Sequence, residues 1–216
     1  MHASLTSYAF YFGTFNPVHF GHLAIAQAAY RQLGFQKVIF IPAGVSPFKQ
    51  NLPDMASSHD RLAMLGNSLT DYPYFTIDPI ELERPDVSYS IITLDQLRER
   101  YAIPAEHKIP FIIGTDALAH LDQWYEYERL IEQVVFIQAP RDGSPLRTRL
   151  HNGTPIQTIP IEMPMDTRQS SMIRQQFNTG APIEGDVPPA VVHYLNEHPL
   201  IWKQPAIPAA SHPPTR

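Results

Sequence analysis

The feature that most constrains the fold is an alternation along the chain of short apolar runs and longer segments with a helical period. The runs are rich in aromatic and β-branched residues, which is typical of buried strands. Strands that alternate with helices indicate β-α-β units, in which helices cover both faces of a parallel sheet. We therefore predict a doubly wound, mostly parallel α/β fold. Its strands are expected at 7–12, 37–41, 74–77, 108–113, 134–138 and, more weakly, 156–159, and its helices near 22–33, 59–68, 90–101, 124–132, 170–178 and 188–197.

Length and composition favour one globular domain. A chain of 216 residues with 44% hydrophobic side chains can bury one sizeable core, whereas two domains would both be small. We assign residues 1–203 to this domain. The segment 204–216 is rich in proline and alanine and has no period, so we predict a flexible tail there.

Charge and cysteine content exclude several classes of protein. The formal net charge is −5 and charged residues make up 17%, so no basic surface for nucleic acid is expected. The absence of cysteine excludes disulfides, thiolate metal sites and thiol nucleophiles. No run approaches the roughly 18 apolar residues that span a bilayer, and the N-terminal residues lack a signal-peptide pattern. We expect a soluble, cytoplasmic protein without a membrane partner; a homo-oligomer is compatible with the sequence.

The most informative segment is Gly-Thr-Phe-Asn-Pro-Val-His-Phe-Gly-His at residues 13–22, between the first predicted strand and the first predicted helix. In an open parallel sheet this position lies at the carboxyl edge, where ligands bind. Gly13 and Gly21 let the backbone approach a ligand closely, and the first turn of the helix offers unpaired N–H groups. An anion is therefore expected at this loop.

Two histidines, His19 and His22, are candidates for contact with that anion. They are three residues apart, so they converge on one bound group if the helix begins near Phe20. Two imidazole donors beside a helix N-terminus suit a polyphosphate whose charge grows during group transfer. Two alternatives stay open: ordinary packing, and a zinc site, which would need a further ligand that does not follow at metal spacing.

The segment 13–22 resembles the signature of the HxGH nucleotidyltransferases, and its residues are similar to those of the same motif in the nicotinate mononucleotide adenylyltransferases. It has neither the Lys-Ser/Thr ending of a Walker loop nor the Gly-x-Gly-x-x-Gly of dinucleotide oxidoreductases. The resemblance implies a Rossmann-like fold that binds ATP and nicotinate mononucleotide. The site residues that it implies here are Gly13, Thr14, Phe15, His19 and His22 for ATP, and Asn16 for the second substrate.

A second segment that resembles this family is Phe-Ile-Ile-Gly-Thr-Asp-Ala-Leu at 111–118. If the chain order reverses between the first and fourth strands, the ends of these strands flank one crevice, and Gly114 and Asp116 face the histidines. A carboxylate there can accept hydrogen bonds from ribose hydroxyls. The resemblance implies adenosine contact for Gly114 and Asp116, and stacking of the pyridine ring near Trp124. The alternatives are a helix cap for Asp116 and core packing for Trp124.

Further segments are similar to the family in part. After the second predicted strand, Lys49 matches the lysine of the family's motif and is suited to phosphate contact. The alternative is a solvated lysine on the surface. Phe48 replaces the histidine that the family usually has at this position. In 81–90, Ser90 stands where the family usually has threonine, so a hydrogen bond to the nicotinate side is implied. The segment 59–65 resembles the family's Arg-x-x-Met-Leu helix and is interpreted as core packing.

The last similar segment is Arg-Gln-Ser-Ser-Met-Ile-Arg at 168–174, which resembles the family's Ile-Ser-Ser-Thr-x-Ile-Arg, with Gln169 as a departure. Ser170 and Ser171 begin a predicted helix, where hydroxyl and backbone N–H groups can bind phosphate. Arg174, one turn later, supplies a fork of donors for phosphate oxygens. The alternative is a surface helix cap with a solvated arginine.

The reaction that the resemblance implies is attack by the phosphate of nicotinate mononucleotide on the α-phosphorus of ATP, with loss of pyrophosphate. His19 and His22 would contact the polyphosphate. Lys49 and Arg174 would neutralise the negative charge of the leaving pyrophosphate. Mg²⁺ would arrive bound to ATP, since the sequence shows no cluster of carboxylate residues that would hold the ion. Three alternatives stay open: another HxGH transferase, such as a phosphopantetheine adenylyltransferase or a cytidylyltransferase; a catalytically silent nucleotide-binding module; and nicotinamide mononucleotide as the substrate.

Overall fold

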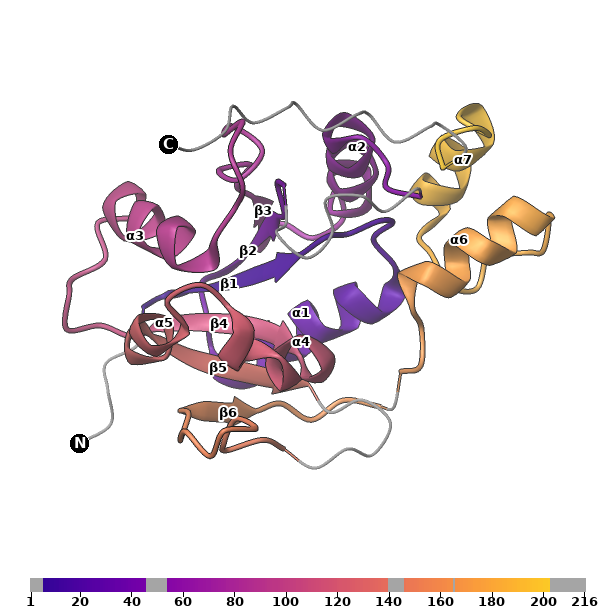
Figure 1. Cartoon of the computed structure of the whole chain (residues 1–216). Helices are drawn as coiled ribbons and strands as arrows, with labels where there is room; N and C mark the ends of the chain where they lie inside the picture. Colours follow the sequence, from indigo (N-terminus) through magenta and orange to yellow (C-terminus); the bar gives the residue numbers. More distant parts are fainter. Residues whose placement is uncertain (1–5, 46–53, 140–145, 165, 203–216) are drawn as a thin grey trace, which may run out of the picture.

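The computed structural model describes residues 6–45, 54–139, 146–164 and 166–202, and its centre is a sheet of six parallel strands (Figure 1). The strand order β3-β2-β1-β4-β5-β6 confirms a doubly wound, Rossmann-like α/β fold. All six predicted strands are present, with ends shifted by one or two residues. The strands are β1 (Tyr8–Gly13), β2 (Lys37–Pro42), β3 (Phe75–Ile77), β4 (Ile109–Gly114), β5 (Val134–Ala139) and β6 (Thr158–Pro160).

Helices flank the sheet near the positions expected from the sequence, with one correction. The predicted helix 124–132 begins later, because Glu126 has a left-handed backbone conformation, with φ of 49°, that a right-handed helix does not include. Two short helices that were not predicted, α4 and η1, precede it, and they are too short to show a helical period. The helices are α1 (Phe20–Leu33), α2 (Ser58–Ser68), α3 (Ser90–Arg100), α4 (Thr115–Ala119), η1 (Leu121–Gln123), α5 (Tyr127–Gln133), α6 (Ser170–Thr179) and α7 (Pro189–Glu197).

Each face of the sheet carries its own hydrophobic core, because alternate residues of a strand point to opposite faces. On one face, Tyr11, Phe40 and Ile112 pack with residues of α1, α2, α6 and α7. On the other face, Phe10 and Phe111 pack with residues of α3, α4 and α5. The central strands are thus buried on both sides, which explains why their sequences are almost continuously apolar.

The order of the strands reverses at β1, which pairs with β2 on one side and with β4 on the other. In folds of this type, the connections that leave the carboxyl ends of these two strands diverge to opposite faces, and ligands bind between them. Since β1 ends at Gly13 and β4 ends at Gly114, the two strongest sequence motifs meet at this edge.

Some predicted features lie outside the described residues. These are Lys49, Phe48 and the tail 204–216. In the part of the chain that the structure does describe, no helix is long and apolar enough to cross a membrane.

Candidate active site

The segment 13–22, called the histidine loop below, connects β1 to α1, and its shape depends on two glycines. A Cβ atom at Gly13 would come within 2.7 Å of the ring of Phe15, which is buried and has a left-handed φ of 49°. A Cβ atom at Gly21 would come within 2.9 Å of Nδ1 of His19. Only glycine at these two positions leaves room for the two rings.

His19 and His22 lie against one another at the start of α1. Their ring centroids are 3.7 Å apart, with 31° between the ring planes. The helix begins at Phe20, which is the condition under which the sequence predicted that the two rings converge. The backbone N–H of His19 donates to Nδ1 of His22 over 3.2 Å, so the neutral ring of His22 carries its proton on Nε2.

A zinc site at His19 and His22 would need a third protein ligand. Among the residues that the structure describes, no group of three or more His, Cys, Asp or Glu side chains could hold a metal ion. Three protein ligands are the usual minimum for a zinc site. The role of His19 and His22 as donors to an anion stays a prediction.

Arg61 of α2 holds the first part of the histidine loop. Its Nη1 donates to the carbonyl oxygen of Thr14 over 2.8 Å, and only 3% of the residue is exposed. Burial lowers the pKa of this guanidinium to about 10, while the charge of Glu81 has the opposite effect. The interpretation of 59–65 as core packing is thus incomplete, because one of its residues positions the loop.

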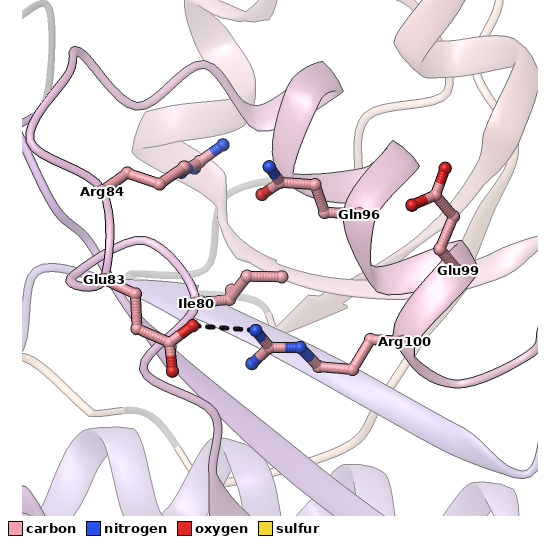
Figure 2. A pocket seen from close by; sticks show the side chains of 6 residues that line it. All are labelled: Ile80, Glu83, Arg84, Gln96, Glu99 and Arg100. Carbon is pink, nitrogen blue, oxygen red and sulfur yellow. Dashed lines mark hydrogen bonds and ion pairs between the residues drawn. The ribbon is translucent and has the colours of Figure 1, made fainter.

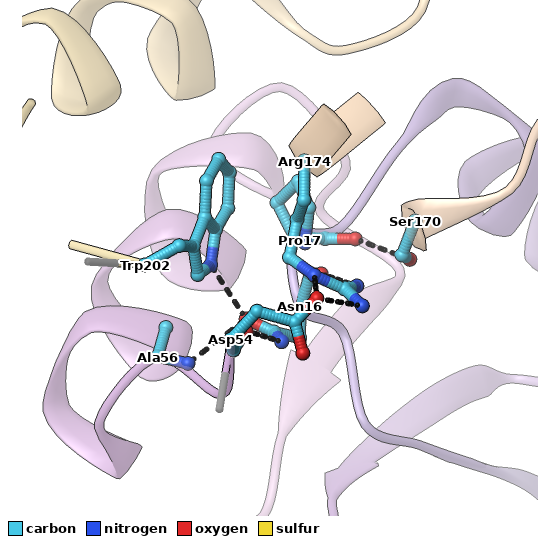
Figure 3. A network of polar contacts seen from close by, with 7 residues as sticks. All are labelled: Asn16, Pro17, Asp54, Ala56, Ser170, Arg174 and Trp202. Atoms are coloured by element: carbon cyan, nitrogen blue, oxygen red, sulfur yellow. Dashed lines mark hydrogen bonds and ion pairs between the residues drawn. The ribbon is translucent and has the colours of Figure 1, made fainter. Parts of the chain in front are cut away.

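The first turn of α6 holds the second part of the loop (Figure 3). Ser170 donates from Oγ to the carbonyl oxygen of Pro17 over 3.0 Å. Arg174 donates from Nη1 to the carbonyl oxygen of Asn16 over 2.8 Å, and its Nε and Nη2 each lie 2.6 Å from a carboxylate oxygen of Asp54. These contacts use three of the five N–H groups of the guanidinium. The N-termini of α1 and α6 thus lie beside the same loop, and both favour an anion.

The side chain of Asn16 is turned into the protein beneath the loop (Figure 3). Its Oδ1 accepts hydrogen bonds from the backbone N–H of Ala56 at 3.2 Å and from Nε1 of Trp202 at 3.0 Å. Its Nδ2 donates to the carbonyl oxygen of Asp54 over 2.9 Å, and only 3% of the residue is exposed. The sequence predicted substrate contact for Asn16; the contacts found are internal, and they tie the loop to two distant segments.

The carboxyl end of β4 lies next to that of β1, because the two strands are neighbours in the sheet. Gly114 is the residue that precedes α4, and Asp116 is the second residue of this helix, so Asp116 is not its cap. The side chain of Asp116 is outside the described part of the structure, and its contact with ribose stays a prediction. Beside this corner, Phe12 and Phe111 stack in parallel with 4.1 Å between ring centroids.

The residues expected to bind the pyridine mononucleotide lie on the face of the sheet opposite to α1. Ser90 is the first residue of α3, and Trp124 directly follows η1. Trp124 packs against the core of this face, with its ring centroid 6.5 Å from that of Phe111, and is only partly buried. Tyr89 and Tyr125 lie 4.6 Å apart between ring centroids. Core packing and ring stacking are therefore both compatible with Trp124.

Glu81, the first residue of the segment 81–90 that is similar to the family, is a buried carboxylate that holds the backbone after β2 at Gly44. Glu81 is 4% exposed and accepts hydrogen bonds from the backbone N–H of Gly44 at 3.1 Å and from Oγ1 of Thr93 at 2.8 Å. Burial raises the pKa of Glu81, while the hydrogen bonds from Thr93 and Gly44 and the charge of Arg84 lower it. The sequence placed Glu81 in a segment similar to the family, but its burial and its hydrogen bonds with Gly44 and Thr93 could not be predicted, because charged residues are mostly exposed.

A cavity of about 480 Å³ opens between the segment 80–84 and α3 (Figure 2). None of the predicted site residues lines it. An ion pair of Glu83 with Arg100, 2.8 Å long, lies at its edge, and the cavity is open to solvent. Ligand pockets are mostly apolar and largely enclosed, so this cavity differs from a typical ligand site.

The chain is similar in sequence to known proteins over most of its length. Residues 10–176 match the family described as cytidylyltransferase-like. A protein of Bacillus subtilis (strain 168), named nicotinate-nucleotide adenylyltransferase, is 32% identical over 188 residues, which cover 87% of this chain and 94% of the relative. A protein of Synechococcus sp. (strain JA-3-3Ab), named "Probable nicotinate-nucleotide adenylyltransferase", is 38% identical over 192 residues, which cover 87% of this chain and 91% of the relative.

The fold is also similar to solved structures. Plasmodium falciparum nicotinic acid mononucleotide adenylyltransferase, in its complex with NaAD, superimposes with a TM-score of 0.73 and 15% identity, covering 90% of this chain and 96% of that one. Its complex with APC gives a TM-score of 0.72 at 14% identity, with the same coverage. At this level of identity the likeness shows a shared fold.

Proposed function

The chain belongs to the nicotinate-nucleotide adenylyltransferases of the cytidylyltransferase-like family, and from that premise we propose that it transfers the adenylyl group of ATP to nicotinate mononucleotide. The products are nicotinate adenine dinucleotide and pyrophosphate, so the reaction is a step of NAD biosynthesis. The observation that carries the proposal is the pair of imidazoles, 3.7 Å apart between ring centroids, at the point where the strand order reverses.

In the proposed reaction, a phosphate oxygen of the mononucleotide attacks the α-phosphorus of ATP, and the bond to pyrophosphate breaks. No covalent enzyme intermediate is needed, so the protein acts by positioning the substrates and by stabilising charge. His22 donates from Nε2 to the polyphosphate, because its Nδ1 already accepts from the backbone. His19 is stacked against it and is 1% exposed, so its contact with the same phosphate chain is proposed on its match to the family.

The other proposed ATP contacts surround the histidine loop. Ser170 and Ser171 begin α6 and offer first-turn N–H groups to phosphate. Arg174 offers the two N–H groups that its contacts with Asp54 and Asn16 do not use. Lys49 is retained as a phosphate contact on its match to the family. The remaining proposed contacts are Gly13, Thr14, Gly114 and Asp116, with the buried ring of Phe15 shaping the loop.

The mononucleotide is proposed to bind beside the start of α3. Ser90 offers a hydroxyl and a first-turn N–H group, and the partly exposed ring of Trp124 offers a stacking surface for the pyridine ring. Asn16 would act on this substrate through the loop that it holds, since its amide is engaged within the protein.

We propose that magnesium enters with ATP and is held by phosphate oxygens. The groups that the structure describes at the histidine loop include hydrogen-bond donors, namely the imidazoles, the hydroxyl of Ser170 and the guanidinium of Arg174, and the carboxylate of Asp54 there is paired with Arg174. Such donors suit phosphate oxygens, whereas magnesium prefers carboxylate and phosphate oxygens as ligands. When bound, the ion would neutralise part of the phosphate charge during transfer. We also propose a cytoplasmic location, where ATP is available for biosynthesis.

The test is the release of pyrophosphate from ATP with different acceptors. We expect release with nicotinate mononucleotide, and the same assay with nicotinamide mononucleotide measures the preference between the two. Release with phosphopantetheine, or from CTP with glycerol phosphate, would instead support another transferase of the superfamily. Binding of ATP without release with any acceptor would support the silent nucleotide-binding module and refute the proposal.

A further inference from the structure

Two segments of the candidate site are joined by the two carboxylate oxygens of Glu81, a side chain that is almost completely buried. Oε2 accepts from the backbone N–H of Gly44 in the loop after β2, at 3.1 Å. Oε1 accepts from Oγ1 of Thr93, at 2.8 Å, in the helix that begins with Ser90. One carboxylate therefore connects the loop after β2 with the start of α3.

The charge of Glu81 also acts on Arg61 of α2, a third segment of the candidate site. Arg61 is buried, and the negative charge of Glu81 favours its protonated form. The same guanidinium donates to the carbonyl oxygen of Thr14 in the histidine loop. Arg61 holds Thr14 by its own hydrogen bond, and the charge of Glu81 favours the protonated guanidinium that donates it.

The surroundings of Glu81 leave little room for movement. A Cβ atom at Gly44 would come within 2.4 Å of the carbonyl oxygen of Glu81 and within 2.5 Å of Oγ of Ser88. The backbone N–H of Ser88 donates to the carbonyl oxygen of Val45 over 2.9 Å. Gly44 and Val45 are thus packed directly against the segment that leads to α3, and a change at Glu81 would be transmitted to both.

We propose that Glu81 is a positioning residue of the active site, which fixes the backbone that follows β2 through Gly44 and the start of α3 through Thr93. It acts through these residues and does not touch a substrate. The inference rests on the proposed function and adds to it the group that aligns the ATP side of the site with the mononucleotide side.

The first test compares the kinetics of Glu81→Gln with those of Glu83→Gln. Glutamine keeps the volume and an acceptor oxygen but loses the charge. We expect Glu81→Gln to lower kcat/KM by roughly tenfold or more, with KM raised for both ATP and nicotinate mononucleotide. Glu83 is half exposed and pairs with Arg100 at the edge of the cavity, so Glu83→Gln should leave these constants unchanged (Figure 2). Unchanged kinetics in Glu81→Gln would overturn the proposal.

A second control separates positioning from stability. Leu94 is fully buried in the same helix as Thr93, so Leu94→Ala lowers the melting temperature without removing a contact of Glu81. All variants are assayed at a temperature at which circular dichroism shows them folded. If Leu94→Ala raises both KM values as much as Glu81→Gln does, Glu81 has only a structural role and the proposal fails.

A third measurement does not depend on activity. Amide hydrogen exchange at Gly44 should be faster in Glu81→Gln than in wild type or Glu83→Gln, because this amide donates to the carboxylate. If Glu81→Gln does not fold, Gly44→Ala is used, since the added Cβ pushes the loop away from Glu81 with the charge retained; both KM values should again rise. Wild-type protein without pyrophosphate release would refute the proposed function, whereas unchanged exchange at Gly44 would refute this inference alone.

Discussion

The two sides of the candidate site are built in different ways. On the side proposed for the phosphates, three carbonyl groups of the histidine loop, those of Thr14, Asn16 and Pro17, accept hydrogen bonds from side chains of two helices. On the pyridine side, Trp124 and Tyr125 are held by ring packing, and Tyr125 is 51% exposed. Hydrogen bonds fix direction as well as distance, whereas contacts between rings tolerate small displacements.

This difference matches the demands of the proposed reaction. In-line attack on the α-phosphorus of ATP depends on alignment, and displacements of about 1 Å can cost a hundredfold in rate. Recognition of a flat ring depends mainly on shape and contact area. The contrast predicts that changes at the phosphate side alter turnover or stability, while changes at the pyridine side alter substrate affinity.

The largest effect is expected for His22→Ala, which removes the Nε2 donor. We expect kcat to fall by roughly a hundredfold or more, in line with the loss of one donor to developing negative charge. The measurement is pyrophosphate release at saturating ATP and nicotinate mononucleotide. His193→Ala is the matched control, because the side chain of His193 is 77% exposed on α7 and should not affect turnover. Full turnover in folded His22→Ala would remove the distinction between the two sides.

An intermediate effect is expected for Asn16→Ala, which acts on stability. The substitution leaves the N–H of Ala56 and Nε1 of Trp202 without their acceptor in a buried site. We expect a loss of about 2 kcal/mol in the free energy of unfolding, and a melting temperature lower by roughly 6 °C. Trp202→Phe removes only one of the two donors and should cost less. Equal melting temperatures for Asn16→Ala and wild type would mean that this network does not hold the loop.

The smallest effect is expected for Trp124→Leu, which keeps an apolar side chain but removes the ring face. KM for nicotinate mononucleotide should rise by roughly two- to tenfold, as for the loss of one ring contact. KM for ATP and kcat should stay within about twofold of wild type. A change in kcat larger than that in KM would show that Trp124 aligns the reacting groups, and would thus contradict the contrast.

The fold and the backbone of the phosphate side could be predicted from local sequence. The alternation of strands and helices specified the doubly wound sheet, and the spacing of His19 and His22 from the end of β1 placed both rings at its carboxyl edge. These are properties of short segments, in which hydrophobic period and glycine positions determine the local backbone.

The groups that hold the site in place could not be predicted in this way. Arg61 lies 47 positions from Thr14, and Trp202 lies 186 positions from Asn16, so their hydrogen bonds exist only once the chain has folded. Arg174 was predicted only as a phosphate contact, yet it also forms an ion pair with Asp54. No sequence pattern around Asp54 indicates this pairing. Charged residues are mostly exposed, so composition alone favours the surface for each of them.

The hydrogen bond between Trp202 and Asn16 has a consequence for how the protein is made. The histidine loop is synthesised long before Trp202, but the side-chain amide of Asn16 at its centre obtains one of its donors only after residue 202 has left the ribosome. Until then the loop is incomplete, and a nascent chain should bind ATP weakly if at all. An engineered truncation before residue 202 would therefore disturb the phosphate side of the site, although the deleted residues are remote from it in sequence.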